Sequence, residues 1–252
     1  MNRLGTACAL LAILLLSGCD DPKKGKPSDA KSAAASAKPV TTAADVSKPK
    51  TMPELLVDPE GPYLGGRRID LAAANGKDKL AEVIKDLPIN SQAVSLQVEK
   101  KAKTPHVAAV VQALGAAGAP KVILKTNGRD DLPKEVVVTP ESRISSPPAC
   151  AVAATVLKDL STAVWPQKGG LGKRQWKGLA GPDLSHTGET LEKDLAACDS
   201  TIAFFSSDDE VQWEDAFNLA GTIVISDKKK RIDMLVLTHE APVAGRPLNL
   251  AK

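Results

Sequence analysis

Residues 94–126 read VSLQVEKKAKTPHVAAVVQALGAAGAPKVILKT and contain the pattern that decides the fold. The first five alternate between apolar and polar residues, which is typical of a half-buried strand. From Val107 onward, apolar residues recur at the third, fourth and seventh positions, as on one face of a helix. The apolar residues 122–124 predict a second strand. This order predicts two parallel strands joined by a right-handed crossover.

The ends of the helix are indicated by its flanking residues. Thr104 and Pro105 suit the N-cap and the first helical position, because a threonine hydroxyl can accept from a free backbone N–H and proline lacks one. Gly118, followed by Pro120, suits the other end, because glycine adopts the left-handed conformation that closes many helices.

Upstream, residues 54–71 predict two short strands joined by a turn at residues 58–61, with Gly65 and Gly66 forming a further turn. A helix over about residues 77–87 follows. The predicted order over residues 54–126 is therefore strand, strand, helix, strand, helix, strand.

This order, with a hairpin around a glycine turn, the VSLQV strand, a capped helix near a proline and the AAGAPKVIL ending, resembles the periplasmic domain of the ExbD/TolR biopolymer-transport family. The resemblance implies an α+β fold, a ββαβαβ unit with a mixed sheet and helices on one face. In this family a single transmembrane helix bears an aspartate that works with a partner channel. This chain lacks that helix, and Asp20 and Asp21 cannot replace its aspartate, so energy transduction is not carried over.

The second half repeats the order, which predicts two tandem units of this type at residues 54–140 and 141–252. The expected elements are strands at 161–170 and 173–178, a helix at 187–197, a strand at 201–205, a helix at 210–220 capped by Ser207 and Asp208, and a strand at 232–237. Family members carry one copy per chain and work as dimers, so the resemblance implies an internal pseudo-dimer. The connecting residues 127–149 include KEVVVTP, an additional candidate strand.

The N-terminal residues predict export. A 10-residue apolar run, Ala7 to Leu16, follows a basic start and is too short to span a bilayer, which takes ~20 residues. It ends in Leu-Ser-Gly-Cys, which resembles the lipobox of bacterial lipoproteins. The resemblance implies a signal peptide at residues 1–18 and lipid attachment at Cys19, which would anchor the chain in a membrane. The alternative is an ordinary secretory signal cleaved near Gly18.

Residues 19–53 predict a lipidated cysteine and a disordered tether, because large apolar residues are almost absent. As a flexible coil the tether would span roughly 30 Å. It carries a net charge of +3 and Arg3 is the charge of the signal, so the chain's total of +3 leaves −1 for residues 54–252. A near-neutral body argues against nucleic acid as a partner. The aspartate after Cys19 resembles the inner-membrane retention signal of enteric bacteria, which favours a periplasm-facing place on the inner rather than the outer membrane.

Cysteine usage agrees with an oxidising compartment. Cys8 leaves with the signal and Cys19 takes the lipid, so Cys150 and Cys198 remain and are expected to form a disulfide. A metal site is not expected, because the three histidines stand far apart with no ligand spacing: His106, His186 and His239.

Catalytic motifs are not found. In GGLGKR, residues 169–174, a P-loop would need glycine where Gln167 stands and serine or threonine where Arg174 stands, and a dinucleotide fingerprint would need glycine at Gln175. No cofactor is expected. One cluster holds enough carboxylates for acid-base work or calcium, but its place at a predicted helix start favours capping: Asp208, Asp209, Glu210, Glu214 and Asp215.

The sequence therefore predicts a non-catalytic, lipid-anchored binding or scaffolding protein of the cell envelope, with an envelope protein or peptidoglycan as its partner. The alternative is an envelope hydrolase, which a pocket gathering Asp208, Asp209 and His239 would favour. Three tryptophans are candidates for sugar stacking or partner binding, although core packing is the favoured use in a chain with few aromatic residues: Trp165, Trp176 and Trp213.

Overall fold

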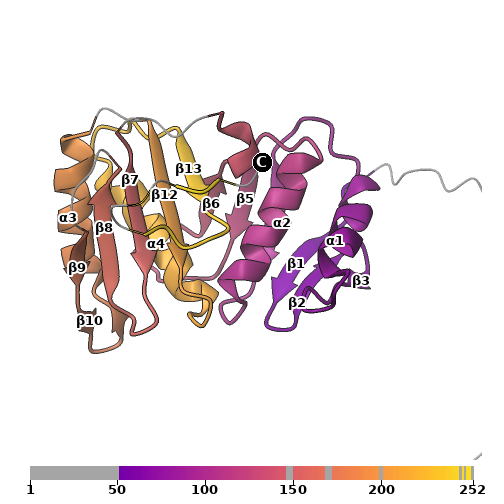
Figure 1. The fold of residues 1–252 in the computed structure, drawn as a ribbon, viewed down its shortest axis with the longest axis horizontal. Helices are drawn as coiled ribbons and strands as arrows, with labels where there is room; N and C mark the ends of the chain where they lie inside the picture. Colours follow the sequence, from indigo (N-terminus) through magenta and orange to yellow (C-terminus); the bar gives the residue numbers. More distant parts are fainter. Residues whose placement is uncertain are drawn as a thin grey trace, which may run out of the picture. The chain divides into compact units, whose positions relative to one another are not determined.

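The strand-helix-strand order predicted for residues 94–126 is present in the computed structural model (Figure 1). Strand β4 is Val94–Val98, helix α2 is Thr104–Ala116 and strand β5 is Val122–Lys125. β4 and β5 pair in parallel, as predicted. Gly118 has a φ of +111°, which agrees with its predicted place just after the helix.

The structure describes residues 51–145, 150–167, 172–198, 201–243, 246 and 248–250. They all belong to one compact unit, Val46–Lys252. The fold is α+β, with mixed sheets and, among these residues, four α-helices.

The first half forms a six-stranded sheet of order β3-β2-β1-β4-β5-β6. The hairpin β1–β2 is antiparallel and β1 pairs in parallel with β4. The predicted additional strand in KEVVVTP is β6, which pairs antiparallel with β5. The remaining elements of this half are β1 Leu55–Asp58, β2 Gly61–Leu64, β3 Arg67–Arg68, α1 Gly76–Lys85 and β6 Glu135–Val138. The 3₁₀-helix η1 Glu141–Arg143 follows β6.

The second half forms a five-stranded sheet of order β13-β12-β7-β8-β9, and β10 and β11 form a separate two-stranded hairpin. Its elements are β7 Val152–Val156, β8 Thr162–Pro166, β9 Lys173–Gln175, β10 Lys177–Gly178, β11 Gly181–Pro182, α3 Leu184–Ala196, β12 Ile202–Ser207, α4 Trp213–Ser226 and β13 Met234–Leu237.

The two halves have the same strand order. β3-β2-β1-β4-β5 in the first corresponds to β9-β8-β7-β12-β13 in the second. In both, the first three strands along the chain form antiparallel pairs and the last two extend the sheet in parallel. α2 and α4 therefore occupy the same place in their halves, between the last two parallel strands.

The prediction for the second half missed β7, the strand at the centre of its sheet. Its residues are buried throughout, with Val152 and Ala154 in the main core and Ala153 in a second cluster on the other side of the sheet. Because both faces are covered, this strand shows no alternation of apolar and polar residues. The residues predicted to form the first hairpin of this half, 161–170 and 173–178, contain β8 and β9, which do pair antiparallel but are the second and third strands of the sheet along the chain.

Two predicted helix caps are wrong. Thr104 is the first residue of α2 and follows the N-cap Lys103; its Oγ1 accepts a hydrogen bond from Ser207 Oγ at 2.7 Å. Ser207 ends β12, and Asp208 Oδ1 accepts from Glu210 N in the following turn. α4 therefore begins at Trp213 instead of residue 210.

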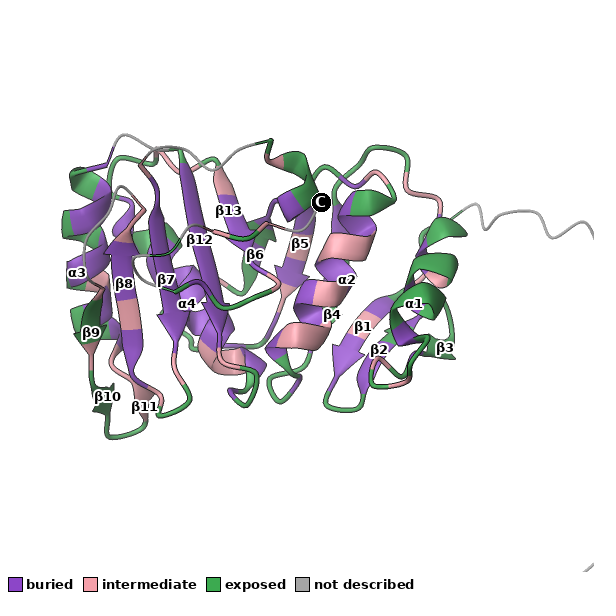
Figure 2. Cartoon of the chain, in the orientation of Figure 1, coloured by how far each residue is buried: buried purple, intermediate pink, exposed green. Residues whose placement is uncertain are grey.

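One hydrophobic cluster includes residues of both halves and of all four helices (Figure 2). Trp213 of α4 is fully buried, and its Nε1 donates to Thr126 Oγ1 at the end of β5, at 2.7 Å. Thr139, after β6, donates its backbone N–H to the carbonyl of Leu235 in β13 at 2.8 Å. The halves thus share one core and are joined by hydrogen bonds.

Candidate binding surface

The side of the sheet away from the main core differs between the two halves. In the second half a separate apolar cluster covers it: Trp165 and Phe204 project into this cluster, and Leu248 and Leu250 of the C-terminal segment pack against them. Because this side is covered, β7 and β12 are buried on both faces.

In the first half the described residues form no such cluster over the corresponding side. Ser95 and Gln97 of β4 are exposed, whereas the alternate residues of the same strand are buried in the core. Val137 of β6 is 47% exposed. Lys125 and Glu135, cross-strand partners on β5 and β6, form an ion pair at 3.0 Å on this side. We call this side, formed by β1, β4, β5 and β6, the bare face.

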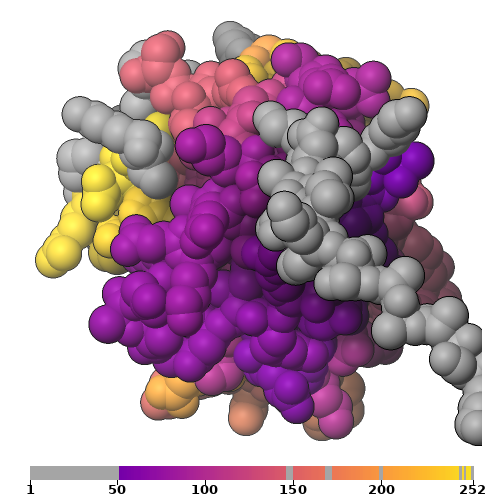
Figure 3. Space-filling model, turned by 90° about the vertical axis from the view of Figure 1, so that its right-hand side faces the viewer, coloured from indigo at the N-terminus to yellow at the C-terminus, as the bar shows by residue number. Residues whose placement is uncertain are grey.

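One end of the bare face is hollowed by an open pocket of about 640 Å³. Its lining combines apolar side chains with amides and a hydroxyl, and its charged groups are Glu54 and Lys125. Such a lining suits hydrogen bonding to an extended polar ligand. The lining residues are Met52, Pro53, Glu54, Leu55, Pro88, Ile89, Asn90, Gln92, Ala93, Val94, Ser95, Gln97 and Lys125. Figure 3 views the molecule from the side of the early strands, in indigo and violet.

The outer edge of this sheet is fixed by Asp58 in the predicted turn. Asp58 Oδ1 accepts from the backbone N–H groups of Glu60 and Gly61, at 2.8 and 3.2 Å, and from Arg68 Nη1 at 2.5 Å. The hydrogen bond from Arg68 holds the pKa of Asp58 below its usual value, against the raising effect of burial. Gly61 has a φ of +123°, which strongly favours glycine in this turn.

The predicted acidic cluster does not converge on one site. Glu210 pairs with Lys158 at 2.5 Å and Glu214 with Lys100 at 2.9 Å. Glu214 and Asp215 lie in the first turn of α4, where acids interact favourably with the helix dipole, as predicted. The other three acids precede the helix. Burial raises the pKa of Asp215.

His239 has a partner that the sequence did not indicate. Its backbone N–H donates to Glu141 Oε1 at 2.5 Å, and its Nδ1 lies 2.9 Å from Glu141 Oε2. Glu141 is fully buried at the start of η1, and Gln112 of α2 accepts from its backbone N–H at 3.1 Å. None of the three residues of the hydrolase alternative lines the hollow or any of three smaller pockets beside the helices: Asp208, Asp209 and His239. The Glu141–His239 pair therefore links η1 to the chain after β13, and none of those four pockets lies beside it.

The other two histidines, His186 and His106, lie in separate surroundings. His186 shares a hydrogen bond of 2.7 Å with Asp183, the N-cap of α3, and this bond raises the pKa of His186. Burial lowers the pKa of His106. Among the residues that the structure describes, no three metal-binding side chains come together.

The GGLGKR stretch falls partly on residues 168–171, which lie outside the described residues. Lys173 Nζ binds Asp194 Oδ1 at 2.6 Å and Arg174 Nε donates to Ser161 Oγ at 2.9 Å. Both cations are thus engaged within the protein.

The three tryptophans divide by burial. Trp165 and Trp213 are 2% and 0% exposed and pack in the two clusters, whereas Trp176 is 71% exposed. Arg174 lies over the Trp176 ring, with its guanidinium carbon 4.7 Å from the ring centre. Core packing is therefore the use of two tryptophans, and only Trp176 remains a surface candidate.

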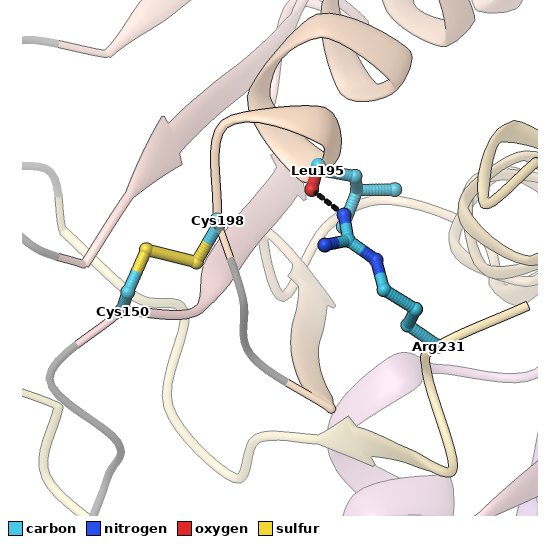
Figure 4. Close-up of a disulfide and its surroundings, with 4 residues drawn as sticks. All are labelled: Cys150, Leu195, Cys198 and Arg231. Carbon is cyan, nitrogen blue, oxygen red and sulfur yellow. Dashed lines mark hydrogen bonds between the residues drawn. A yellow bond between two sulfur atoms is a disulfide. The ribbon is translucent and has the colours of Figure 1, made fainter. Parts of the chain in front are cut away.

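Cys150 and Cys198 form the predicted disulfide, with an S–S distance of 2.08 Å (Figure 4). It links the residues before β7 to the end of α3. Beside it, Arg231 donates a hydrogen bond to the carbonyl of Leu195 in the last turn of α3. The connection between helix and sheet is thus both covalent and hydrogen-bonded.

The predicted signal peptide, Cys19 and residues 20–50 of the tether lie outside the described residues. In the part of the chain that is described, no helix has the length and apolar character needed to cross a membrane.

Comparison of the chain with family models, with curated proteins and with solved structures finds no match.

Proposed function

We propose that the protein is a non-catalytic, lipid-anchored binding or scaffolding module of the cell envelope, related to the periplasmic domains of the ExbD/TolR biopolymer-transport family. The observation that carries the proposal is the bare face. Leu248 and Leu250 of the C-terminal segment pack on one sheet, while among the described residues its counterpart leaves amides, a hydroxyl and apolar side chains beside an open hollow. An exposed surface of this kind is suited to a partner.

The strand order supports the relationship. Each half has the hairpin, helix, strand, helix, strand arrangement that the resemblance implies, so two tandem units, 54–140 and 141–252, account for the repetition of topology. The partner is an envelope protein or peptidoglycan, whose peptide and sugar groups match the amides and hydroxyl of the hollow.

Binding is tested by capture from an envelope extract and by sedimentation with purified peptidoglycan, using the mature protein. Gln97→Arg, in the middle of the bare face, should lower capture at least about tenfold, because a large charge replaces a neutral amide at the contact. Glu82→Arg, on the exposed side of α1, is the matched control and should leave capture unchanged. Equal capture by both variants and the wild type would remove the bare face as the binding site.

The anchor is tested separately. Cys19→Ser should move the protein from the membrane pellet to the soluble fraction, because the lipid attaches to that sulfur. Urea-washed membranes should retain the wild type and release the variant. Continued pelleting of the variant would contradict lipid attachment at Cys19.

A further inference from the structure

The chain from β9 to β11 presents its apolar side chains to solvent. Trp176 is 71% exposed, and Leu179, in the turn between β10 and β11, is fully exposed. Lys177 is exposed between them. Residues 172–182 contain three cations and no acid. β9 is the outer strand of the five-stranded sheet, so this segment, the hairpin at residues 173–182, stands at an edge of the structure (Figure 1).

The base of this hairpin is firmly held. Lys173 Nζ pairs at 2.6 Å with Asp194, whose side chain is nearly buried on α3. Gln175 Nε2 donates to Thr190 Oγ1 of the same helix at 3.1 Å. Arg174 binds Ser161 and also Asp159, and its guanidinium stacks on Trp176. Trp176 is therefore presented on a supported element, at a low cost in conformational entropy on binding.

The chemistry of the tip matches a bilayer surface. Tryptophan is enriched at the headgroup level of membranes, because its ring is apolar and its N–H is polar. A neighbouring leucine can enter the acyl region while an exposed lysine faces anionic headgroups. Two of the three cations in the segment pair with acids of the body, Lys173 with Asp194 and Arg174 with Asp159. Lys177 is exposed and has no ion pair among the described residues, whereas residues 54–252 carry a net charge of −1. An anionic surface would therefore attract the tip of the hairpin at Lys177 rather than the body as a whole.

We infer that the hairpin at residues 173–182 docks on the surface of the anionic bilayer to which the chain is tethered, with Trp176 and Leu179 entering the interface. This inference rests on the anchor of the proposed function, because one tryptophan and one leucine bind a bilayer weakly on their own. In the proposed function, the anchor at Cys19 holds the body near the membrane, which makes the contact intramolecular. Docking would fix the orientation of the body relative to the membrane.

The fluorescence of Trp176 provides the test, since Trp165 and Trp213 are buried. The mature lipidated protein is reconstituted in vesicles of phosphatidylethanolamine and phosphatidylglycerol, with or without brominated acyl chains. We expect a blue shift, at least about threefold protection from acrylamide relative to the soluble Cys19→Ser chain, and quenching by bromine. Trp176→Phe should abolish all three changes, which assigns them to this residue.

Leu179→Ser keeps the fluorophore and removes the apolar neighbour, so bromine quenching should fall by at least about half. Val224→Ser, at an exposed apolar position on α4, is the matched control and should keep the full quenching. Protein that pellets with the vesicles while Trp176 stays open to acrylamide overturns the docking and leaves the anchor intact. Wild-type protein that does not pellet contradicts the anchor, and bromine quenching at high lipid concentration then decides on the hairpin alone. Protection by purified peptidoglycan without protection by vesicles would also overturn the docking.

Discussion

Lys103 and Gln212, the residues that immediately precede α2 and α4, form an antiparallel β-bridge. The backbone N–H of Trp213 donates to the carbonyl of Ala102 at 2.9 Å beside it. Because the two helices occupy the same place in the two halves, corresponding positions contact one another. In a two-fold symmetric dimer the same surface patch meets itself in this way, which supports the proposal of an internal pseudo-dimer.

The first prediction concerns this pairing. Residues 52–140 alone should self-associate or be unstable, because Thr139 would lose its bond to Leu235 and the core would lose Trp213. Residues 52–252 should remain monomeric in light scattering at roughly the same protein concentration, since the matching surface is already occupied. A stable, monomeric first half would mean that the halves are independent, and the pseudo-dimer would be abandoned.

Trp213 should be among the most costly residues to truncate. Trp213→Ala would leave a large cavity between α4 and β5 and would remove the hydrogen bond to Thr126 Oγ1, lowering the free energy of unfolding by about 3–5 kcal/mol. Urea denaturation followed by circular dichroism measures it. Trp176→Ala is the matched control: its side chain is mostly exposed, so the change should stay within about 0.5 kcal/mol. Similar effects of the two substitutions would contradict the shared core.

The disulfide should be complete and stabilising. Titration of the unfolded, non-reduced mature protein should find no free thiol from Cys150 or Cys198. They are 48 residues apart, so the chain-entropy model gives a loss of about 4 kcal/mol on reduction. The double variant Cys150→Ser, Cys198→Ser should match the stability of the reduced protein. Two reactive thiols in the non-reduced protein would disprove the bond.

Asp58 should make stability depend on acid pH. Its folded pKa lies below the ordinary value of 3.8, so its ionised form stabilises the fold above that pH, and the contribution is lost as the pH falls through the folded pKa. Asp58→Asn keeps an acceptor for the turn but loses the charge beside the partly exposed Arg68, which should cost about 1 kcal/mol at pH 7.

Urea denaturation from pH 7 to pH 2.5 measures this difference. The gap between wild type and Asp58→Asn should be constant above about pH 5 and shrink below pH 4. Asp209→Asn, at an exposed position, should show no such gap. A gap as large at pH 2.5 as at pH 7 would show that the carboxylate charge is not its source.

The local pattern of the sequence accounts for the elements of the first half. The alternation in VSLQV and the helical spacing from Val107 depend only on which faces are buried, so β4, α2 and β5 lie where they were predicted. β7 was not predicted, because the side of this strand away from the main core is covered by residues more than 90 positions later in the chain, such as Leu248 and Leu250. Burial on both sides removes the alternation that marks a strand.

The helix starts show the same limit. A hydroxyl or carboxylate before a helix is a capping group only if nothing else engages it, and Thr104 and Ser207 instead bind each other across 103 residues. His239 likewise looked isolated in the sequence, and its partner Glu141 precedes it by 98 residues. Contacts between residues about 100 positions apart cannot be predicted from the local sequence pattern.

By itself, then, the sequence determined the α+β order of the first half, the hairpin turn at Asp58 and the pairing of Cys150 with Cys198, because periodicity, turn chemistry and cysteine count act locally or by elimination. Only the tertiary structure decided which tryptophan faces solvent, which sheet remains bare and which polar residues meet between the halves. Those outcomes depend on what another part of the chain covers, and burial is a property of the assembled fold.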